Sequence, residues 1–495
     1  MILEKKLIQL NKFLSKNEYA YNLRWWNYAT LGLPLEIADL NEEKKKIYYD
    51  DSLLKAFEEV KEKEVNEIKN RKVKLYLRQI YMNRVELNDD LLKLKDEIIE
   101  DELSSVSTIN GKEYSIKELL SIVKNSLDPY IFNEARKRLD ELNKRKEEKF
   151  VEIIRLRNEL SRKLGFKNYI DIYFYGLEPS INEYIEFTEK TITSSTEKAK
   201  DWESWLKLTT CKNKTNDALK EIKEELRVYY DLLNPVKTFI DILKIWGLED
   251  LSTRIHIFTS KDLLNKKHWW TFCQPINIPD DIRISINELD SVEFVETLYH
   301  ELGHSIHYAS IVENEWIFKK EDLFTEIPAS FMANICSEDE WIERFLKIKD
   351  TSIKEKIKRV SVSRDPTVIL SRCLEFLLMV RLYEKEENPN NIFNDSYKKI
   401  FAYRGQDLFS RKEWNFEILF IEEPFYSLFH LIGEVIGRKI LDFIIKEYKS
   451  IFCEYVGKTI RDKLFKPGNS VSWVKRISNL LNVDLQVHRL YEIYL

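Results

Sequence analysis

Residues 290–308 of the chain read DSVEFVETLYHELGHSIHY. Apolar residues recur in this stretch at spacings of three and four, which predicts an amphipathic helix. His300 and His304 lie one turn apart on the same face of such a helix, so both imidazoles can bind one metal ion. Glu301 lies about 100° around the helix axis from His300, close enough to reach a water molecule on that ion. The stretch therefore predicts a zinc site of the kind that hydrolytic enzymes use.

The sequence also indicates how this helix begins and packs. Asp290 is a suitable N-cap, and Glu293, three residues later, completes the pattern of a capping box. Gly303 costs about 1 kcal/mol relative to alanine in a helix interior, and the chain has only 11 glycines. We therefore expect a substrate or a neighbouring backbone to pack closely against Gly303.

Catalytic zinc usually has three protein ligands and keeps one position for water, so a further ligand is expected after His304. His307 lies too far from His300 along a rigid helix to join the pair, and no histidine follows in the metzincin spacing. A carboxylate is therefore favoured. The candidates that follow are Glu313, Glu315, Glu321, Asp322, Glu326, Glu338 and Glu340.

Glu326 is the best placed of these carboxylates. It lies in a mostly apolar stretch, residues 323–334, whereas the others lie among polar neighbours and are predicted to be solvated. A carboxylate in apolar surroundings is costly unless it has a partner such as a metal ion. His300, His304 and Glu326 are therefore the predicted ligands of one zinc ion. The alternative is that Glu326 caps a helix near Pro328.

The HELGH helix and the FTEIPAS stretch at residues 324–330 resemble the M3-type gluzincin peptidases, the group of thimet oligopeptidase and oligoendopeptidase F. In that group a glutamate on a second helix is the third zinc ligand, which implies the same role for Glu326. Residues 157–169, with their leucine-glycine-phenylalanine turn, and residues 281–286 are also similar to segments of those enzymes. The resemblance covers about the last two thirds of the chain.

A further segment, EPFYSLFHLIG at residues 423–433, resembles the Pro-Phe-Tyr stretch whose tyrosines and a nearby histidine bind the reacting carbonyl in that group. It departs from the group's pattern, because Leu428 and His430 follow where further tyrosines are usual. Tyr426 and His430 can both donate a hydrogen bond to a developing oxyanion, so we expect both to be catalytic. Tyr403 is a third candidate. The alternative is a core aromatic patch with a buried histidine.

The expected chemistry follows from these residues. Zinc lowers the pKa of a bound water toward about 7, Glu301 accepts its proton as general base, and the hydroxide attacks a peptide carbonyl. The resemblance implies oligopeptide substrates, because in that group a deep channel between helical lobes admits only short, flexible chains. The sequence thus predicts a zinc-dependent metallopeptidase whose partners are oligopeptides.

Composition predicts a mainly α-helical fold. Glycine and proline number 11 each in 495 residues, which argues against a turn-rich β architecture. Residues 41–105, 130–164 and 180–245 are dense in Lys, Glu, Leu and Ile at helical spacing. We expect two helical lobes around a deep substrate cleft, with residues 1–180 as an N-terminal lobe that covers the cleft and residues 181–495 as the catalytic lobe.

Strand signals are few and lie just before the zinc helix. Residues 253–258 and 283–286 alternate as half-buried strands do, which predicts a small sheet beside the metal. A substrate could add its backbone as a strand to an edge of this sheet. Residues 261–280 are predicted to form a loop along the cleft. The predicted substrate-binding residues are Arg283, Ile284, Ser285 and Tyr403.

Charge and cysteine content exclude other classes. The net charge is −5, with 33% charged residues of both signs interleaved, which predicts no nucleic-acid partner. No run of about 18 apolar residues is present, so no membrane span is expected. Five scattered cysteines without a CxxC spacing fit a reducing cytoplasm. We expect a cytoplasmic protein that is a monomer or a dimer.

Two other functions stay open. A carboxypeptidase of a related helical gluzincin family would need a cation for the terminal carboxylate of its substrate, and Arg254, Arg283 and Arg404 could supply it. A non-catalytic helical binding protein with a degenerate motif would instead bind no stoichiometric zinc.

Overall fold

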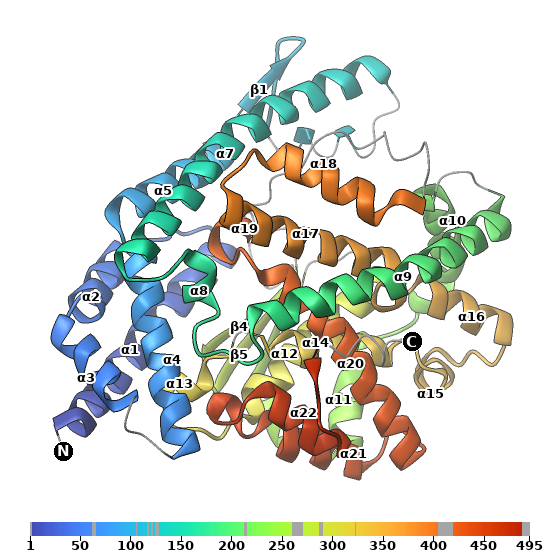
Figure 1. Cartoon of the computed structure of the whole chain (residues 1–495). Helices are drawn as coiled ribbons and strands as arrows, with labels where there is room; N and C mark the ends of the chain where they lie inside the picture. The colour runs from blue at the N-terminus through green and yellow to red at the C-terminus, as the bar shows by residue number, and fades with distance from the viewer. Residues whose placement is uncertain are drawn as a thin grey trace.

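A computed structural model of the chain confirms the mainly α-helical fold (Figure 1). It describes residues 2–61, 66–104, 106–115, 118–119, 122–123, 128–211, 215–259, 271–286, 291–321, 323–403 and 419–487. The helices before the zinc-binding motif are α1 (Ile2–Leu31), α2 (Ala38–Tyr48), α3 (Asp51–Lys61), α4 (Glu67–Glu86), α5 (Asp89–Ser104), α7 (Pro129–Lys163), α8 (Tyr169–Tyr173), α9 (Ile181–Thr210), α10 (Thr215–Tyr230), α11 (Pro235–Ile245) and the short η1 (Glu249–Thr253).

The second half of the chain is also built from helices. They are α12 (Ser291–Ser310), α13 (Trp316–Lys319), α14 (Glu326–Ile335), α15 (Asp339–Trp341), η2 (Ile342–Leu346), α16 (Thr351–Val360), η3 (Val362–Arg364), α17 (Pro366–Lys385), α18 (Pro389–Ile400), α19 (Leu419–Glu422), α20 (Tyr426–Tyr448), α21 (Glu454–Ile460), η5 (Arg461–Phe465), η6 (Gly468–Ser470) and α22 (Trp473–Leu481). Among them α12, α14 and α20 lie together (Figure 1).

Local sequence explains where the long helices begin. Asp128 accepts hydrogen bonds from the first turn of α7, and Pro129 follows it at the first helical position. Ser180 and Glu183 form a capping box at the start of α9. The stretches predicted to be helical therefore match α2 to α5, α7 and α9 to α11.

One hairpin was not predicted. Strands β1 (Val106–Ile109) and β2 (Lys112–Ser115) pair antiparallel. The turn between them consists of Asn110 and Gly111, which both have positive φ angles, 52° and 78°. Asn-Gly is the dipeptide that favours such a two-residue turn, so the sequence carried the signal.

The predicted small sheet is present, with one strand more than expected. Its strands are β3 (Ile255–Thr259), β4 (Phe272–Asn277) and β5 (Asp281–Ile286), in the order β3-β5-β4. β3 is parallel to β5, and β4 is antiparallel to it. The prediction of a loop over residues 261–280 is wrong for β4, whose Phe272 and Ile276 pack with Trp26 of α1. Residues 261–270 lie outside the described residues.

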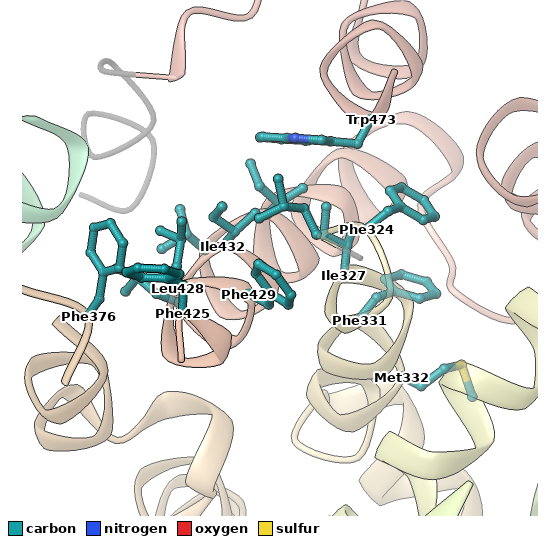
Figure 2. Close-up of a cluster of buried hydrophobic side chains, with 14 of the residues drawn as sticks. Phe324, Ile327, Phe331, Met332, Phe376, Phe425, Leu428, Phe429, Ile432 and Trp473 are labelled. Carbon is teal, nitrogen blue, oxygen red and sulfur yellow. The ribbon is translucent and has the colours of Figure 1, made fainter. Parts of the chain in front are cut away.

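A continuous apolar core joins the helices around the HELGH motif. Figure 2 shows Phe324, Ile327 and Phe331, from α14 and the turn before it, beside Phe429 and Ile432 of α20. The same cluster of buried side chains extends from α1 to the last described residues. The division into lobes at residue 180 stays a prediction.

Two expectations from composition concern membranes and disulfides. Within the part of the chain that the structure describes, no helix is both long and apolar enough to cross a bilayer. Cys211, Cys273, Cys336, Cys373 and Cys453 are all free. The cytoplasmic location itself stays a prediction.

The segment at residues 157–169 connects distant helices through a buried arginine. Arg157 of α7 is fully buried and bonds to Glu86 of α4 at 2.8 and 2.9 Å. It also donates to the hydroxyl of Tyr383 of α17 and to the carbonyl of Ile421, at 2.8 and 2.5 Å. Lys95 of α5 lies 2.7 Å from Glu86. This network ties α4, α5 and α7 to the segment that precedes α20.

The pH dependence of stability tests this network. Burial would raise the pKa of Glu86, but Arg157 and Lys95 outweigh it and lower that pKa from 4.5 to about 2. The folded form is then stabilised at pH values above 4.5, and the stabilisation is lost as the pH falls toward 2. We expect the wild type to lose about 2 kcal/mol more unfolding free energy between pH 7 and pH 3 than Glu86→Gln does.

Urea unfolding at the two pH values measures this difference. Glu148→Gln, at an exposed position of α7, is the matched control and should follow the wild type. Equal losses for the wild type and Glu86→Gln would contradict the role of the network.

Candidate metal centre

Close approaches between helices place the predicted site residues. α14 packs against both α12 and α20. A Cβ atom on Gly303 of α12 would lie 2.4 Å from the carbonyl oxygen of Pro328, and one on Gly433 of α20 would lie 2.7 Å from that of Glu326. Glycine is therefore needed at both positions for the backbones to approach. The expectation that a neighbouring backbone packs against Gly303 is confirmed, and Glu326 is held between α12 and α20.

The carboxylate of Glu326 is the centre of the site, and its side chain is 0% exposed. His430 Nδ1 lies 3.1 Å and His300 Nε2 lies 3.3 Å from its Oε2, and His304 Nε2 lies 3.6 Å from its Oε1. The hydroxyl of Tyr426 donates a hydrogen bond of 2.5 Å to Oε1. The structure thus brings the predicted metal ligands and the predicted oxyanion donors to one place.

Among the described residues, the groups that face the carboxylate of Glu326 are histidines and a tyrosine. No lysine or arginine in the described ranges forms an ion pair with Glu326. Burial by itself would raise its pKa, but His430 and His304 outweigh burial and hold the pKa of Glu326 well below its usual range. Oε2 of Glu326 and Nδ1 of His304 are buried without a hydrogen bond of good geometry. Buried polar atoms of this kind are costly, so the site is suited to a cation.

The imidazoles around Glu326 differ in their protonation. Burial lowers the pKa of His304 to about 3 and also lowers the pKa of His430, so both are neutral near pH 7. Burial acts in the same direction on His300, but the carboxylate of Glu326, 3.3 Å from its Nε2, outweighs burial and raises its pKa to about 9. A metal ion at the site would have to displace that proton.

The donor set fits a zinc ion. Ligand atoms of His300, Glu326 and His430 lie within 4.8 Å of one another, and His304 reaches Glu326 from the next turn of α12. Imidazole nitrogens with one carboxylate are a set that zinc accepts. His430 was predicted only as an oxyanion donor, and its position makes it an alternative to His304 as a ligand.

Glu301 lies beside these residues. Burial raises its pKa to about 7, although the charge of His300 and a hydrogen bond from the backbone of Cys273 in β4 oppose the shift. A carboxylate with a pKa near 7 can both accept and return a proton at neutral pH.

The predicted substrate-binding residues Arg283, Ile284 and Ser285 lie on the central strand of the sheet, not on an edge. β5 is the central strand, so its backbone is paired on both sides, with β3 and with β4. Ile284 and Ser285 are 0% exposed. Arg283 is paired with Asp281 at 2.7 Å and lies over the ring of Trp26. Ile284 and Ser285 are therefore buried in the sheet, Arg283 is engaged with Asp281 and Trp26, and the role of all three in substrate binding stays a prediction.

Two other predicted residues have partners of their own. The hydroxyl of Tyr403 donates to Glu203 of α9 at 3.1 Å, so it is engaged away from Glu326. Arg254 donates to the carbonyl of Ala309 at 2.9 Å. Arg404 lies outside the described residues, as do Asp290, the predicted helix cap, and Asp322, one of the acidic candidates.

Glu321, predicted to be solvated, is buried. It lies 3.0 Å from Arg476 of α22 and 3.2 Å from His307. The prediction failed because the partner Arg476 lies far along the chain. His307 faces Glu321 and stands apart from the group around Glu326, as expected of a residue too far along the helix to bind the same ion.

Sequence reasoning missed Glu434 of α20. Burial raises its pKa to about 7, and its Oε2 has no hydrogen-bond partner. A signal was available, because Glu434 follows Tyr426 and His430 at the four-residue spacing that places side chains on one helix face.

The chain has the fold of the helical gluzincin metallopeptidases of the M3 and M32 types. A protein described as an oligoendopeptidase F matches with a TM-score of 0.67 and 14% sequence identity, over 98% of this chain and 89% of its own. PZ peptidase A with an inhibitor matches with a TM-score of 0.64 and 13% sequence identity, over 99% of this chain and 92% of its own. M32 carboxypeptidase from Deinococcus radiodurans R1 matches with a TM-score of 0.62 and 10% sequence identity, over 100% of this chain and 98% of its own. No protein-family model and no curated protein sequence matches the chain.

These likenesses confirm the predicted resemblance to the M3-type group at the level of the fold. They also include the M32 carboxypeptidase fold, which the sequence had kept as an alternative.

Gly303→Ala tests the close approach of the helices. Its added Cβ would overlap the backbone at Pro328 and Ala329, so we expect α12 to move away from α14. Overpacking of this kind costs about 1–3 kcal/mol, and zinc affinity should fall because His300 and His304 move relative to Glu326. Urea unfolding and zinc titration measure the two effects. Unchanged stability together with unchanged zinc affinity would show that the helices are not in such close contact.

Proposed function

We propose that the protein is a zinc-dependent peptidase that hydrolyses peptide bonds in oligopeptides. The observation that carries this proposal is the buried carboxylate of Glu326, with three imidazoles around it and no ion pair to a described lysine or arginine. The fold shared with M3- and M32-type metallopeptidases supports it.

His300, His304 and Glu326 would hold the metal ion. The two histidines are one turn apart on α12, and both approach Glu326 of α14, so two helices would share the ligands. A zinc ion bound there lowers the pKa of a water molecule and polarises a carbonyl group.

Glu301 would act as general base. Its pKa of about 7 leaves a substantial fraction ionised at neutral pH, so it can take a proton from the attacking water. The same pKa allows it to return that proton to the leaving amine. The backbone hydrogen bond from Cys273 would orient the carboxylate during both transfers.

Tyr426 and His430 would stabilise the oxyanion. Both side chains lie at Glu326, at 2.5 and 3.1 Å, and both carry a group that can donate a hydrogen bond. Each side chain would have to turn its donor group from Glu326 to the reacting carbonyl, and hydrogen-bond donors that are held in place before the reaction are the effective ones.

The proteins of similar fold support peptides as substrates, since an oligoendopeptidase F and PZ peptidase A are among them. Carboxypeptidase action is the second candidate, because M32 carboxypeptidase has a similar TM-score. Mass spectrometry of the products from a mixed peptide library separates the two, since internal cutting yields paired fragments and carboxypeptidase action releases single C-terminal residues. We also propose that the protein is a monomer or a dimer and that it is cytoplasmic.

Glu301→Gln tests the general base. We expect turnover of a quenched fluorescent peptide to fall at least ~100-fold, the lower range for a positioned acid–base group, while bound zinc stays stoichiometric. Glu447→Gln, at an exposed position of α20, is the matched control and should keep full activity. Unchanged hydrolysis by Glu301→Gln would exclude the role.

Metal analysis of single variants tests the ligand set. His300→Ala, His304→Ala and Glu326→Gln should each lose stoichiometric zinc, because three protein ligands are the usual minimum. His430→Ala should keep zinc and lose turnover. The reverse result, zinc lost in His430→Ala and kept in His304→Ala, would assign the third ligand to His430. Wild-type protein without zinc and without chelator-sensitive hydrolysis would exclude the proposed function.

A further inference from the structure

Lys44 of α2 is a half-buried lysine close to the elements that form the candidate metal centre. Its Nζ lies over the ring of Tyr21 of α1, 5.4 Å from the ring centroid. α1 packs against α2, α13 and β4 (Figure 1). Tyr21 is within electrostatic range of Glu422 and Glu423, so it approaches the segment that leads into Tyr426 and α20.

A second set of residues connects Lys44 with α12. Lys44 is within electrostatic range of Glu18 of α1, and Tyr308 of α12 is within electrostatic range of both Glu18 and Glu326. The ring of Tyr308 stacks on that of His304, with the centroids 6.4 Å apart. Such interactions act over about 10 Å in salt solution, and an extended peptide covers about 3.3 Å per residue. An oligopeptide at Glu326 is therefore long enough to reach Lys44.

The ammonium group of Lys44 forms no ion pair within the described ranges. The repulsion by Lys320, which follows α13, exceeds the attraction by Glu18. Glu18 is already engaged, because it accepts a hydrogen bond from Nε1 of Trp316 and lies 3.7 Å from Nζ of Lys320. An ammonium group that is partly removed from water and faces a like charge is costly, and a bound anion removes this cost.

Both lysines can be approached from solvent. The side chain of Lys320 is 37% exposed, and Lys44 is partly exposed. The described arginines that the sequence had offered for a terminal carboxylate have partners of their own, since Arg254 donates to a backbone carbonyl and Arg283 is paired with Asp281. Lys44 and Lys320 are therefore the better placed cations for an anionic group of a substrate.

We propose that Lys44, together with Lys320, binds a carboxylate of the peptide substrate. This inference rests on the proposed function and adds a class of substrate to it. The free carboxyl terminus of a peptide and an aspartate or glutamate side chain share this chemistry, and both form strong charge-assisted hydrogen bonds with an ammonium group. A peptide without a carboxylate leaves Lys44 without an anionic partner, so it is a poorer substrate.

Peptides of one length and otherwise one sequence test the proposal. One has a free carboxyl terminus and no aspartate or glutamate, a set with amidated termini contains a single glutamate at each position in turn, and one is amidated without any carboxylate. Lys44→Gln removes the charge of the side chain. We expect KM for the preferred carboxylate peptide to rise at least about tenfold, with a smaller change in kcat. The peptide without a carboxylate should change by less than about twofold, which also shows that the variant is folded.

The pattern of losses identifies the carboxylate. A loss with the free carboxyl terminus assigns Lys44 to the end of the peptide, and a loss with one glutamate peptide assigns it to a side chain. Lys44→Arg keeps the positive charge and should keep KM closer to the wild type than Lys44→Gln does. Lys46→Gln, at an exposed position of α2, is the matched control and should leave every peptide unaffected. If Lys44→Gln slows all peptides equally, Lys44 has a structural role and the inference is wrong.

Binding without turnover gives a second readout. In the Glu301→Gln background, calorimetry measures the Kd of each peptide, and adding Lys44→Gln should weaken binding of the preferred carboxylate peptide at least about tenfold. Equal Kd values with and without Lys44→Gln overturn the role of Lys44. Failure of the proposed function is distinguishable, because wild-type protein would then hydrolyse none of the peptides, whereas hydrolysis with equal KM values in wild type and Lys44→Gln overturns this inference alone.

Discussion

The candidate site depends on the burial of one carboxylate. Glu326 is removed from water between α12 and α20, with imidazoles and a tyrosine hydroxyl around it. In such surroundings an ionised carboxylate is stable only when positive charge is supplied. The proposed metal chemistry is therefore coupled to the packing of three helices, and the glycines at 303 and 433 allow that packing.

The N-terminal half of the chain contributes to the site through its contacts with these helices. Arg157 of α7 joins Glu86, Tyr383 and the carbonyl of Ile421, five residues before α20 begins. Buried charged groups of this kind need their partners to be in place. Helices that carry no proposed ligand thus influence where α20, and with it the face that includes His430, lies relative to α12.

The errors of the sequence-based predictions share one physical origin. Residues 261–280 were predicted to form a loop, but β4 lies within them and pairs with β5. Glu321 was predicted to be solvated because its sequence neighbours are polar, but Arg476 buries and neutralises it. In both cases the deciding contact comes from a segment that local patterns do not connect to the residue.

The sequence by itself determined the helical class, the helix that carries His300 and His304, and the choice of Glu326 as the buried carboxylate, because helical spacing and local polarity are properties of short segments. Only the tertiary structure decided that His430 approaches the same carboxylate, that β5 is the central strand, and that Oε2 of Glu434 is buried without a hydrogen bond. These features depend on which surfaces of distant helices and strands meet, and that is set by the packing of the whole core.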